Sequence, residues 1–202
     1  MVFDPKNVSR ETSPGLALYH ELLLKWSPKI NLVAKSTLST AWNRHIQDSA
    51  QVFSLAQGGQ GHWLDIGSGG GFPGMVCAIL AKEQGFDWEF SFIESDQRKC
   101  AFLRTVAREA GVNVVIHAER IEAVPPQTAD VLSARALADL SVLLEFADQH
   151  LARDGIALFQ KGRNWLTEVE NARKTWQFEY EAVDSMTEEG SKILKIAQVT
   201  HV

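Results

Sequence analysis

This sequence has few cysteines, no long apolar segment and no cluster of metal ligands. Cys77 and Cys100 both lie in helix-like apolar stretches, which predicts buried thiols in a reducing compartment. The six histidines are scattered, so no metal site is expected. No apolar run approaches the ~20 residues that a membrane span needs, and the polar start MVFDPKNVSRETS lacks the features of a signal peptide. These absences predict a cytoplasmic protein without a membrane anchor.

The sequence also lacks the excess of basic residues that marks many nucleic-acid-binding proteins. Its formal net charge is −5 over 202 residues. The charge is uneven, because residues 1–60 hold six Lys and Arg against four Asp and Glu, whereas residues 61–152 hold seven against thirteen. A polyanionic partner is therefore expected to meet the N-terminal segment or local basic patches.

Strand-like and helix-like segments alternate from residue 62 onward. Strands are predicted at 62–67, 89–95, 112–118, 129–136 and 155–162, and helices near 73–84, 96–111, 138–152 and 164–176. Two further strand-like runs, 178–185 and 192–202, are separated by a short turn and can pair only antiparallel. The pattern predicts an α/β fold with a Rossmann-like, mostly parallel, doubly wound sheet that ends in an antiparallel strand.

A helical segment precedes this alternation. Helices are predicted at 12–27 and about 37–56, and the stretch QGGQG at 57–61 has the composition of a linker. We therefore expect an N-terminal helical extension, residues 1–60, packed on a main domain of residues 61–202. A chain of this length fits one structural unit, and we expect a monomer.

The stretch LDIGSGGGFPG at 64–74 joins a predicted strand to a glycine-rich loop. So many glycines cost folding entropy, which indicates either a close approach to a ligand or a structural turn. A phosphate loop of the nucleoside triphosphatases is excluded, because it needs a lysine directly after its last glycine. Here the next lysine is Lys82.

Two nucleotide cofactors fit the spacing of the loop. Gly69, Gly71 and Gly74 satisfy the dinucleotide fingerprint, and Glu94 follows twenty residues later at the end of the next predicted strand. Asp65 argues against a dinucleotide, because its carboxylate would repel a pyrophosphate. The same carboxylate suits a cofactor that carries a sulfonium and an ammonium but no phosphate.

S-adenosyl-L-methionine is therefore the favoured cofactor, and the fold is predicted to be a class I methyltransferase. The loop has the form acidic–x–Gly–x–Gly–x–Gly, with Asp65, Gly67, Gly69 and Gly71 in these positions. The glycines let the backbone approach the methionine portion of the cofactor. Glu94 at the next strand end is predicted to accept hydrogen bonds from the ribose hydroxyls.

Several short motifs elsewhere in the chain resemble one family of RNA-modifying enzymes. They are VSRET (8–12), INLV (30–33), RHIQDS (44–49), ERIE (119–122), SARA (133–136) and QKG (160–162). Together with LDIGSGGGFPG, they resemble the bacterial 16S ribosomal RNA guanine-N7 methyltransferases, the glucose-inhibited division protein B (GidB, or RsmG) family. The resemblance covers nearly the whole chain. It implies methyl transfer from S-adenosyl-L-methionine to N7 of one guanine in the RNA of the small ribosomal subunit.

The resemblance also implies roles for individual residues. Gly67 and Phe72 would contact the cofactor, and Ile121 and Glu122 would border its adenine. Arg135 would lie at the cofactor or at the target base. The family commonly has S/T-R-A where this chain has Ser-Ala-Arg-Ala at 133–136, so the alignment needs a one-residue shift at its start.

The chemistry of guanine N7 predicts a positioning catalyst. This nitrogen carries a free lone pair at neutral pH, so no general base is needed and alignment supplies the rate. Arg135 and Lys161 follow the fourth and fifth predicted strands, where open α/β sheets place their sites, and are predicted to do the positioning. Contacts with RNA are predicted for basic residues of the N-terminal segment, strand ends and closing turn, namely Lys35, Arg44, His45, Arg163 and Lys192.

Two other functions fit part of this pattern. One is a small-molecule methyltransferase of the same fold, which the acidic overall charge favours mildly. The other is a non-catalytic ribosome-assembly factor that binds cofactor or RNA without turnover. The net positive charge of residues 1–60 argues against the first, and the intact glycine loop with Glu94 argues against the second.

Overall fold

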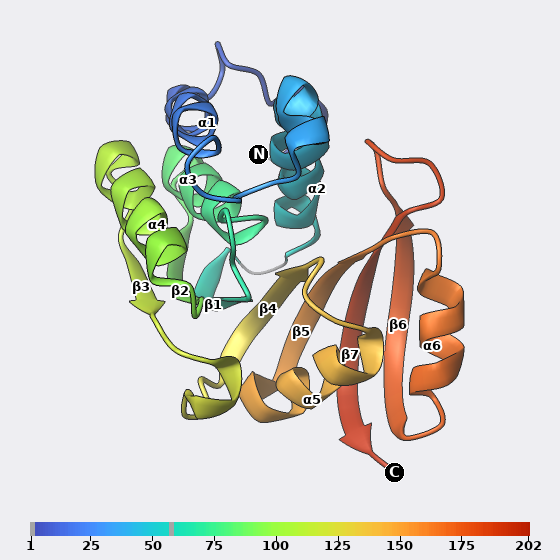
Figure 1. The fold of residues 1–202 in the computed structure, drawn as a ribbon. Helices are drawn as coiled ribbons and strands as arrows, with labels where there is room; N and C mark the ends of the chain where they lie inside the picture. Colours follow the sequence, from blue (N-terminus) through green and yellow to red (C-terminus); the bar gives the residue numbers. More distant parts are fainter. Residues whose placement is uncertain (1–2, 57–58) are drawn as a thin grey trace.

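A seven-stranded sheet forms the centre of the computed structural model, which describes residues 3–56 and 59–202 (Figure 1). Its strands are β1 (Gln60–Ile66), β2 (Asp87–Ile93), β3 (Val114–His117), β4 (Ala129–Arg135), β5 (Leu151–Lys161), β6 (Trp176–Asp184) and β7 (Lys192–His201). They lie in the order β3-β2-β1-β4-β5-β7-β6. Successive strands are therefore added on one side of β1 up to β3, and on its other side from β4 onward. Sheets of this kind open a crevice for ligands between the two strands where the order changes, here β1 and β4.

Strands β1 to β5 are parallel, and β7 is antiparallel to both β5 and β6. The predicted parallel sheet and the predicted antiparallel closing pair are both confirmed. The reversed strand is inserted beside the edge, so that β6 is the edge strand. A short connection forces β6 and β7 to pair with each other, and β7 then completes the ladder of β5.

Six α-helices are described, and they cover both faces of the sheet (Figure 1). They are α1 (Pro14–Trp26), α2 (Asp48–Leu55), α3 (Gly74–Gln84), α4 (Gln97–Ala110), α5 (Leu140–His150) and α6 (Trp165–Ala172). Local sequence explains several ends. The Ser13 side chain accepts from the Leu16 N–H at the start of α1, and left-handed Gly85 and Gly111 end α3 and α4.

The predicted helix at about 37–56 is wrong in its first half. Residues Lys35–Thr40 form a 3₁₀-helix, η2, and Trp42–Gln47 form a π-helical segment, η3, before α2 begins. The irregular turns bring Thr37 Oγ1 within 2.8 Å of His45 Nε2. In a regular α-helix, residues 37 and 45 would lie about 12 Å apart along the axis. A regular helix over this segment would therefore not allow the contact between Thr37 and His45.

Other boundaries differ by a few residues. The second predicted strand, 89–95, lies at Asp87–Ile93, and the third is only four residues long. Of the predicted linker 57–61, residues 57 and 58 lie outside the described part of the chain, and β1 begins at Gln60.

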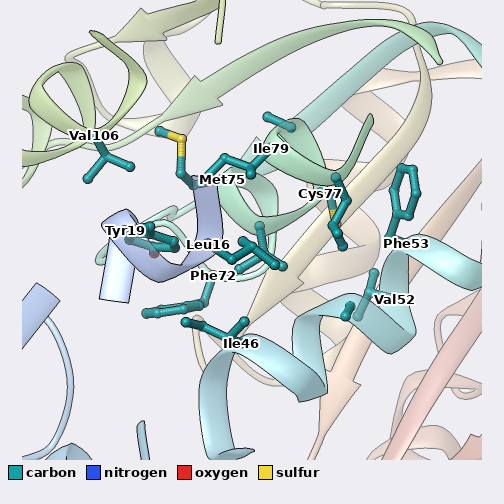
Figure 2. Close-up of a cluster of buried hydrophobic side chains, with 14 of the residues drawn as sticks. Leu16, Tyr19, Ile46, Val52, Phe53, Phe72, Met75, Cys77, Ile79 and Val106 are labelled. Atoms are coloured by element: carbon teal, nitrogen blue, oxygen red, sulfur yellow. The ribbon is translucent and has the colours of Figure 1, made fainter. Parts of the chain in front are cut away.

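Two hydrophobic clusters fill the two sides of the sheet. Helices α1 to α4 pack over one side, where Leu16 and Tyr19 of α1 lie close to Met75 of α3 (Figure 2). Helices α5 and α6 pack over the other side, where the second cluster includes Leu144 of α5 and Phe159 of β5. Because side chains from before and after residue 60 share the first cluster, a domain boundary at residue 60 stays a prediction.

Both cysteines are buried and free, as their apolar surroundings predicted. None of the helices in residues 3–56 and 59–202 is long and apolar enough to cross a membrane.

Candidate active site

The glycine loop after β1 contains three left-handed residues. Gly67, Gly69 and Gly71 have φ values of +60°, +55° and +94°, which side-chain-bearing residues rarely adopt. The nearest atom to a Cβ on Gly69 would be the Gly67 carbonyl oxygen at 3.7 Å, so this glycine borders open space. A Cβ on Gly71 would lie 2.8 Å from the Tyr19 hydroxyl oxygen. Gly71 therefore serves the packing of α1 against the loop, and Gly69 lies at the surface where a cofactor would approach.

Glu94 directly follows β2 and faces this loop. Its side chain is buried, with 8% of the residue exposed. One carboxylate oxygen accepts from the Gly69 N–H at 2.8 Å, and the other accepts from the Asp96 N–H at 2.7 Å. A carboxylate has about four acceptor positions, so each oxygen retains capacity for a further donor. These two hydrogen bonds, which the sequence did not indicate, fix the carboxylate at the end of β2, and its contact with the ribose hydroxyls stays a prediction.

Asp65 lies beneath the loop and has no exposed surface. Its Oδ1 accepts from the Ser133 hydroxyl at 2.5 Å, and its Oδ2 has no hydrogen-bond partner in the described part of the chain. Burial raises the pKa of this carboxyl to about 7, although the hydrogen bond from Ser133 opposes the shift. A Cβ on Gly74 would lie only 2.5 Å from the Asp65 Cβ, so the side chain packs against the start of α3. Its interaction with a cationic cofactor stays a prediction, and at this position it would act through its electric field.

The predicted adenine-binding residues lie after β3. Ile121 and Glu122 belong to η4, the short 3₁₀-helix Ile121–Ala123. Ile121 is buried in the cluster under α5, whereas Glu122 is exposed. The Glu94 N–H donates to the carbonyl of His117 at 3.1 Å, which joins the ends of β2 and β3 at this edge of the sheet.

Arg135 is the last residue of β4, and it meets residues from the N-terminal segment. One guanidinium nitrogen, Nη2, donates to His45 Nδ1. The other, Nη1, lies 3.7 Å from Asp48 Oδ2. The guanidinium carbon lies 5.7 Å from the centre of the Phe72 ring, in the range of a cation–π contact. The structure therefore brings together four residues of three sequence motifs: RHIQDS, FPG and SARA.

His45 is held as a neutral imidazole. Burial and the positive charge of Arg135 lower the pKa of His45 to about 3. An arginine can only donate, so His45 Nδ1 must be the acceptor and Nε2 carries the hydrogen, which points to Thr37 Oγ1 at 2.8 Å. Thr37 in turn donates to the carbonyl of Ala34 at 2.8 Å. Both ring nitrogens are engaged, so His45 orients Arg135 and has no free lone pair.

Asp48 at the start of α2 connects the N-terminal segment to the C-terminal strands. Its Oδ1 accepts from the hydroxyls of Ser185 and Thr187, each at 2.9 Å, in the turn between β6 and β7. Its Oδ2 accepts from the side-chain amide of Gln160, near the end of β5. Arg44, one helical turn earlier, forms an ion pair of 3.2 Å with Glu188. The N-terminal segment is thereby fastened across the ends of β4 and β5.

The other predicted basic residues are dispersed. Lys161 is buried at the end of β5, where Nζ pairs with Glu168 at 2.5 Å and donates to the carbonyl of Ala138 at 2.9 Å. Lys192 pairs with Asp184 at 2.6 Å and lies over the Trp165 ring. Lys35 and Arg163 are exposed. The RNA contacts of these residues and the positioning role of Lys161 stay predictions.

Sequence reasoning missed several residues of this site. Tyr19 holds the loop by donating to the carbonyl of Gly70, and Ser133 holds Asp65. The sequence placed Tyr19 only on the apolar face of a predicted helix. Ordinary core residues produce the same pattern, so it did not indicate a contact with the loop. The motifs RHIQDS and QKG did mark Asp48 and Gln160, but nothing in them indicated that the two side chains meet.

The comparison with protein families gives a direct result. A family model described as GidB, rRNA small subunit methyltransferase G, matches residues 13–197. The chain belongs to this family. The family predicted from the motifs is therefore confirmed.

Individual relatives agree with the family model over nearly the whole chain. Ribosomal RNA small subunit methyltransferase G of Ruegeria sp. (strain TM1040) is 56% identical over 196 residues, which cover 97% of this chain and 95% of that protein. The protein of the same name from Cereibacter sphaeroides (strain ATCC 17025) is 49% identical over 201 residues, covering 100% and 97%. The similarity to these relatives thus extends over nearly the whole length of both chains.

Solved structures confirm the predicted class I methyltransferase fold. A ribosomal protein L11 methylase from Lactobacillus delbrueckii subsp. bulgaricus matches with a TM-score of 0.61 at 19% identity, over 77% of this chain and 79% of that chain. M. jannaschii TYW2, solved in complex with AdoMet, matches with a TM-score of 0.62 at 12% identity, over 87% and 80%. At these identities the likeness concerns the fold alone.

Proposed function

We propose that this protein transfers a methyl group from S-adenosyl-L-methionine to N7 of one guanine in the 16S ribosomal RNA of the small ribosomal subunit. The family match over residues 13–197 supports the RNA substrate. The observation that carries the cofactor is the hydrogen bond between Glu94 and the Gly69 N–H beside open space. It lies at the carboxyl ends of the strands near the β1–β4 pair, where the strand order changes direction.

The residues of the loop fit a sulfonium nucleoside. Gly69 would let its methionine portion approach the backbone, whereas the space beside Gly67 is filled by the side chain of Leu137. Glu94 has acceptor capacity left for two ribose hydroxyls. Ile121 and Glu122 of η4 would border the adenine. When bound, the cofactor supplies a methyl group activated by its positively charged sulfur. Asp65 beneath the loop adds negative potential where that charge would lie.

The protein's own residues act by positioning. Guanine N7 needs no deprotonation, and the engaged nitrogens of His45 leave that residue unavailable as a base. Arg135 is oriented by His45 and Asp48 at the end of β4, where it would align the base or the cofactor. Lys161 supports the same region by joining the segment after β4 to α6.

The proposal extends to partners and surroundings. Exposed Lys35 and Arg163, with Arg44 and Lys192, are the residues proposed to contact the RNA backbone and set its register. His45 was predicted among them, but it is buried with both ring nitrogens engaged, so its proposed part is to orient Arg135. We propose that the protein acts as a monomer in the cytoplasm, without a metal ion. Two buried free thiols are consistent with a reducing compartment.

One labelling experiment tests the whole proposal. Purified protein is incubated with methyl-labelled cofactor and small ribosomal subunits, or their naked RNA, from cells that lack this gene. We expect label in one guanine of the RNA, at N7. Label in no RNA would support a small-molecule methyltransferase or a non-catalytic assembly factor, and label at another base atom would overturn the assignment of N7.

A matched pair of variants tests the cofactor site separately. Glu94→Ala removes both hydrogen bonds of the carboxylate, and we expect cofactor affinity to fall about 10-fold or more. Glu89→Ala removes an exposed carboxylate from the other end of the same strand and should leave the affinity within about twofold. Titration calorimetry measures both. Equal affinities of the two variants would contradict the assignment of Glu94.

A further inference from the structure

Two buried polar atoms without hydrogen-bond partners among the described residues belong to neighbouring side chains at the ends of β4 and β5. They are Arg135 Nη1, a donor, and Gln160 Oε1, an acceptor. Arg135 and Gln160 are direct register partners in the parallel pairing of β4 with β5, so their side chains stand next to each other on the same face of the sheet. Buried polar atoms are nearly always paired, which suggests that a ligand completes this pair.

Asp48 fixes which atom of Gln160 is left free. The Gln160 amide nitrogen donates to Asp48 Oδ2, and a flipped amide would instead place its oxygen against the carboxylate. Asp48 is itself held by the hydroxyls of Ser185 and Thr187. The same carboxylate lies 3.7 Å from Arg135 Nη1. One carboxylate therefore orients both side chains and leaves one donor and one acceptor without hydrogen bonds on neighbouring residues.

A donor beside an acceptor matches one purine and opposes the other. On its pairing edge, guanine has the acceptor O6 next to the donor N1–H. Adenine has the reverse, a donating amino group next to the N1 lone pair. Groups that suit guanine on this edge do not touch N7, which lies beyond O6 on the other edge of the base.

We propose that Arg135 and Gln160 select the target base, with Arg135 Nη1 donating to guanine O6 and Gln160 Oε1 accepting from guanine N1–H. Gln160 is thereby a specificity-determining residue, a role that rests on the proposed function above. Both atoms are covered in this conformation, so base entry includes a displacement of the side chains that cover them. His45 and Asp48 keep their hydrogen bonds to the other nitrogen of each group, Arg135 Nη2 and Gln160 Nε2, and so hold the two free atoms in place.

The variant Gln160→Met tests the proposal, because methionine keeps the length of the side chain and removes the acceptor. The substrates are small subunits, from cells lacking this gene, that carry either the natural guanine or an adenine at the target position. Wild-type protein should methylate the guanine and strongly reject the adenine. For Gln160→Met we expect the ratio of the two kcat/KM values to fall roughly 10- to 100-fold, the range of one lost base contact.

Gln51 provides the matched control. Its amide is paired on both sides, since the nitrogen donates to the Asp184 carbonyl and the oxygen accepts from the Met186 N–H. Gln51→Met thus disturbs the same junction without removing the proposed base contact, and it should leave the guanine-to-adenine ratio at the wild-type value. Cofactor affinity, measured by calorimetry, should stay within about twofold in Gln160→Met, which reports that the fold is intact.

The outcomes separate this inference from the function on which it rests. If wild-type protein labels the guanine and Gln160→Met keeps the wild-type ratio, the inference is overturned and the proposed function stands. An equal fall of the ratio in Gln51→Met would also overturn it, because the effect would then be structural. If wild-type protein labels no guanine N7, both fail.

Discussion

Arg135 Nη2 donates a hydrogen bond to Nδ1 of His45, and the two residues are 90 positions apart in the sequence. The bond joins the end of a core strand, β4, to the π-helical segment η3. The guanidinium is the donor and the imidazole is the acceptor. The pKa of His45 is lowered to about 3, so the ring is neutral and has a lone pair for this bond. A residue of the N-terminal extension thus sets the orientation of a residue of the methyltransferase sheet.

The first prediction concerns that bond. His45→Leu keeps the bulk of the side chain but removes the acceptor, and we expect kcat/KM for the RNA to fall roughly 10- to 100-fold, the worth of a hydrogen bond to a charged group. His45→Asn retains an acceptor near the position of Nδ1 and should recover most of the loss. Methylation kinetics on small subunits measure both. Equal losses in the two variants would show that the hydrogen bond is not the reason for the effect.

The second prediction concerns the pH dependence of folding. In the folded protein His45 titrates at about 3, whereas an unfolded histidine titrates near its ordinary value of 6.5. Between these values the unfolded chain binds the extra proton, so His45 makes the free energy of unfolding decrease as pH falls from 6.5 toward 3. The slope is at most about 1.4 kcal/mol per pH unit.

Denaturant unfolding at several pH values measures this effect as a difference between two proteins. Wild-type protein should lose more stability than His45→Asn between pH 6.5 and pH 4.5. The comparison is needed because Asp65 has the opposite sign: its pKa is raised to about 7, so its contribution to stability decreases as pH rises from about 4 to 7. Parallel curves for wild type and His45→Asn would contradict the prediction.

The third prediction uses Asp65 as a reporter of the cofactor's charge. With a pKa of about 7, this carboxyl is mostly protonated at pH 6. A positively charged ligand above it favours the ionised form, so cofactor binding at pH 6 should release up to one proton. Calorimetry in buffers of different ionisation enthalpy counts this proton. Asp65→Asn should release none, and a wild-type protein that also releases none would show that the cofactor's charge does not reach Asp65.

The sequence allowed the fold and the cofactor loop to be predicted because both depend on local pattern. Alternating strand and helix segments, and a short turn before the last strand, are sufficient for the sheet. Glycines 67, 69 and 71 have the backbone conformations that glycine favours. The contact of Arg135 with His45, and of Asp48 with Gln160, depends on how two distant segments dock, which no local pattern specifies.

The partners of Lys161 also could not be predicted from local sequence. A lysine at the end of a core strand predicted a positioning role at the site. Its ammonium group pairs with Glu168, seven residues later in α6, and with the carbonyl of Ala138. The partner could not be identified from the motif QKG, because Glu168 follows a loop whose path the motif does not describe.

The fourth prediction concerns the support of the glycine loop from below. Tyr19 is fully buried and donates its hydroxyl to the Gly70 carbonyl. Tyr19→Phe leaves that carbonyl unpaired, and we expect the free energy of unfolding to fall by about 1–3 kcal/mol and the cofactor affinity to fall with it. Tyr180→Phe, at a half-buried position on β6, is the control and should stay within about 0.5 kcal/mol. Urea unfolding and calorimetry measure the two quantities, and a loss of stability without loss of affinity would separate the loop from the cofactor site.

The last prediction decides between two roles for Lys161. Lys161→Met leaves the Glu168 carboxylate without its partner at a largely buried position, so we expect a loss of about 3–5 kcal/mol of stability. Adding Glu168→Gln removes the unpaired charge, keeps an acceptor for the Leu140 N–H that Glu168 now binds, and should restore much of that loss. Urea unfolding and methylation rates are measured on the single and the double variant. If stability and rate recover together, Lys161 acts by supporting the segment after β4. If stability recovers and the rate stays low, the ammonium group itself positions the reacting groups. This is the role that the place of Lys161 at the end of a core strand predicted.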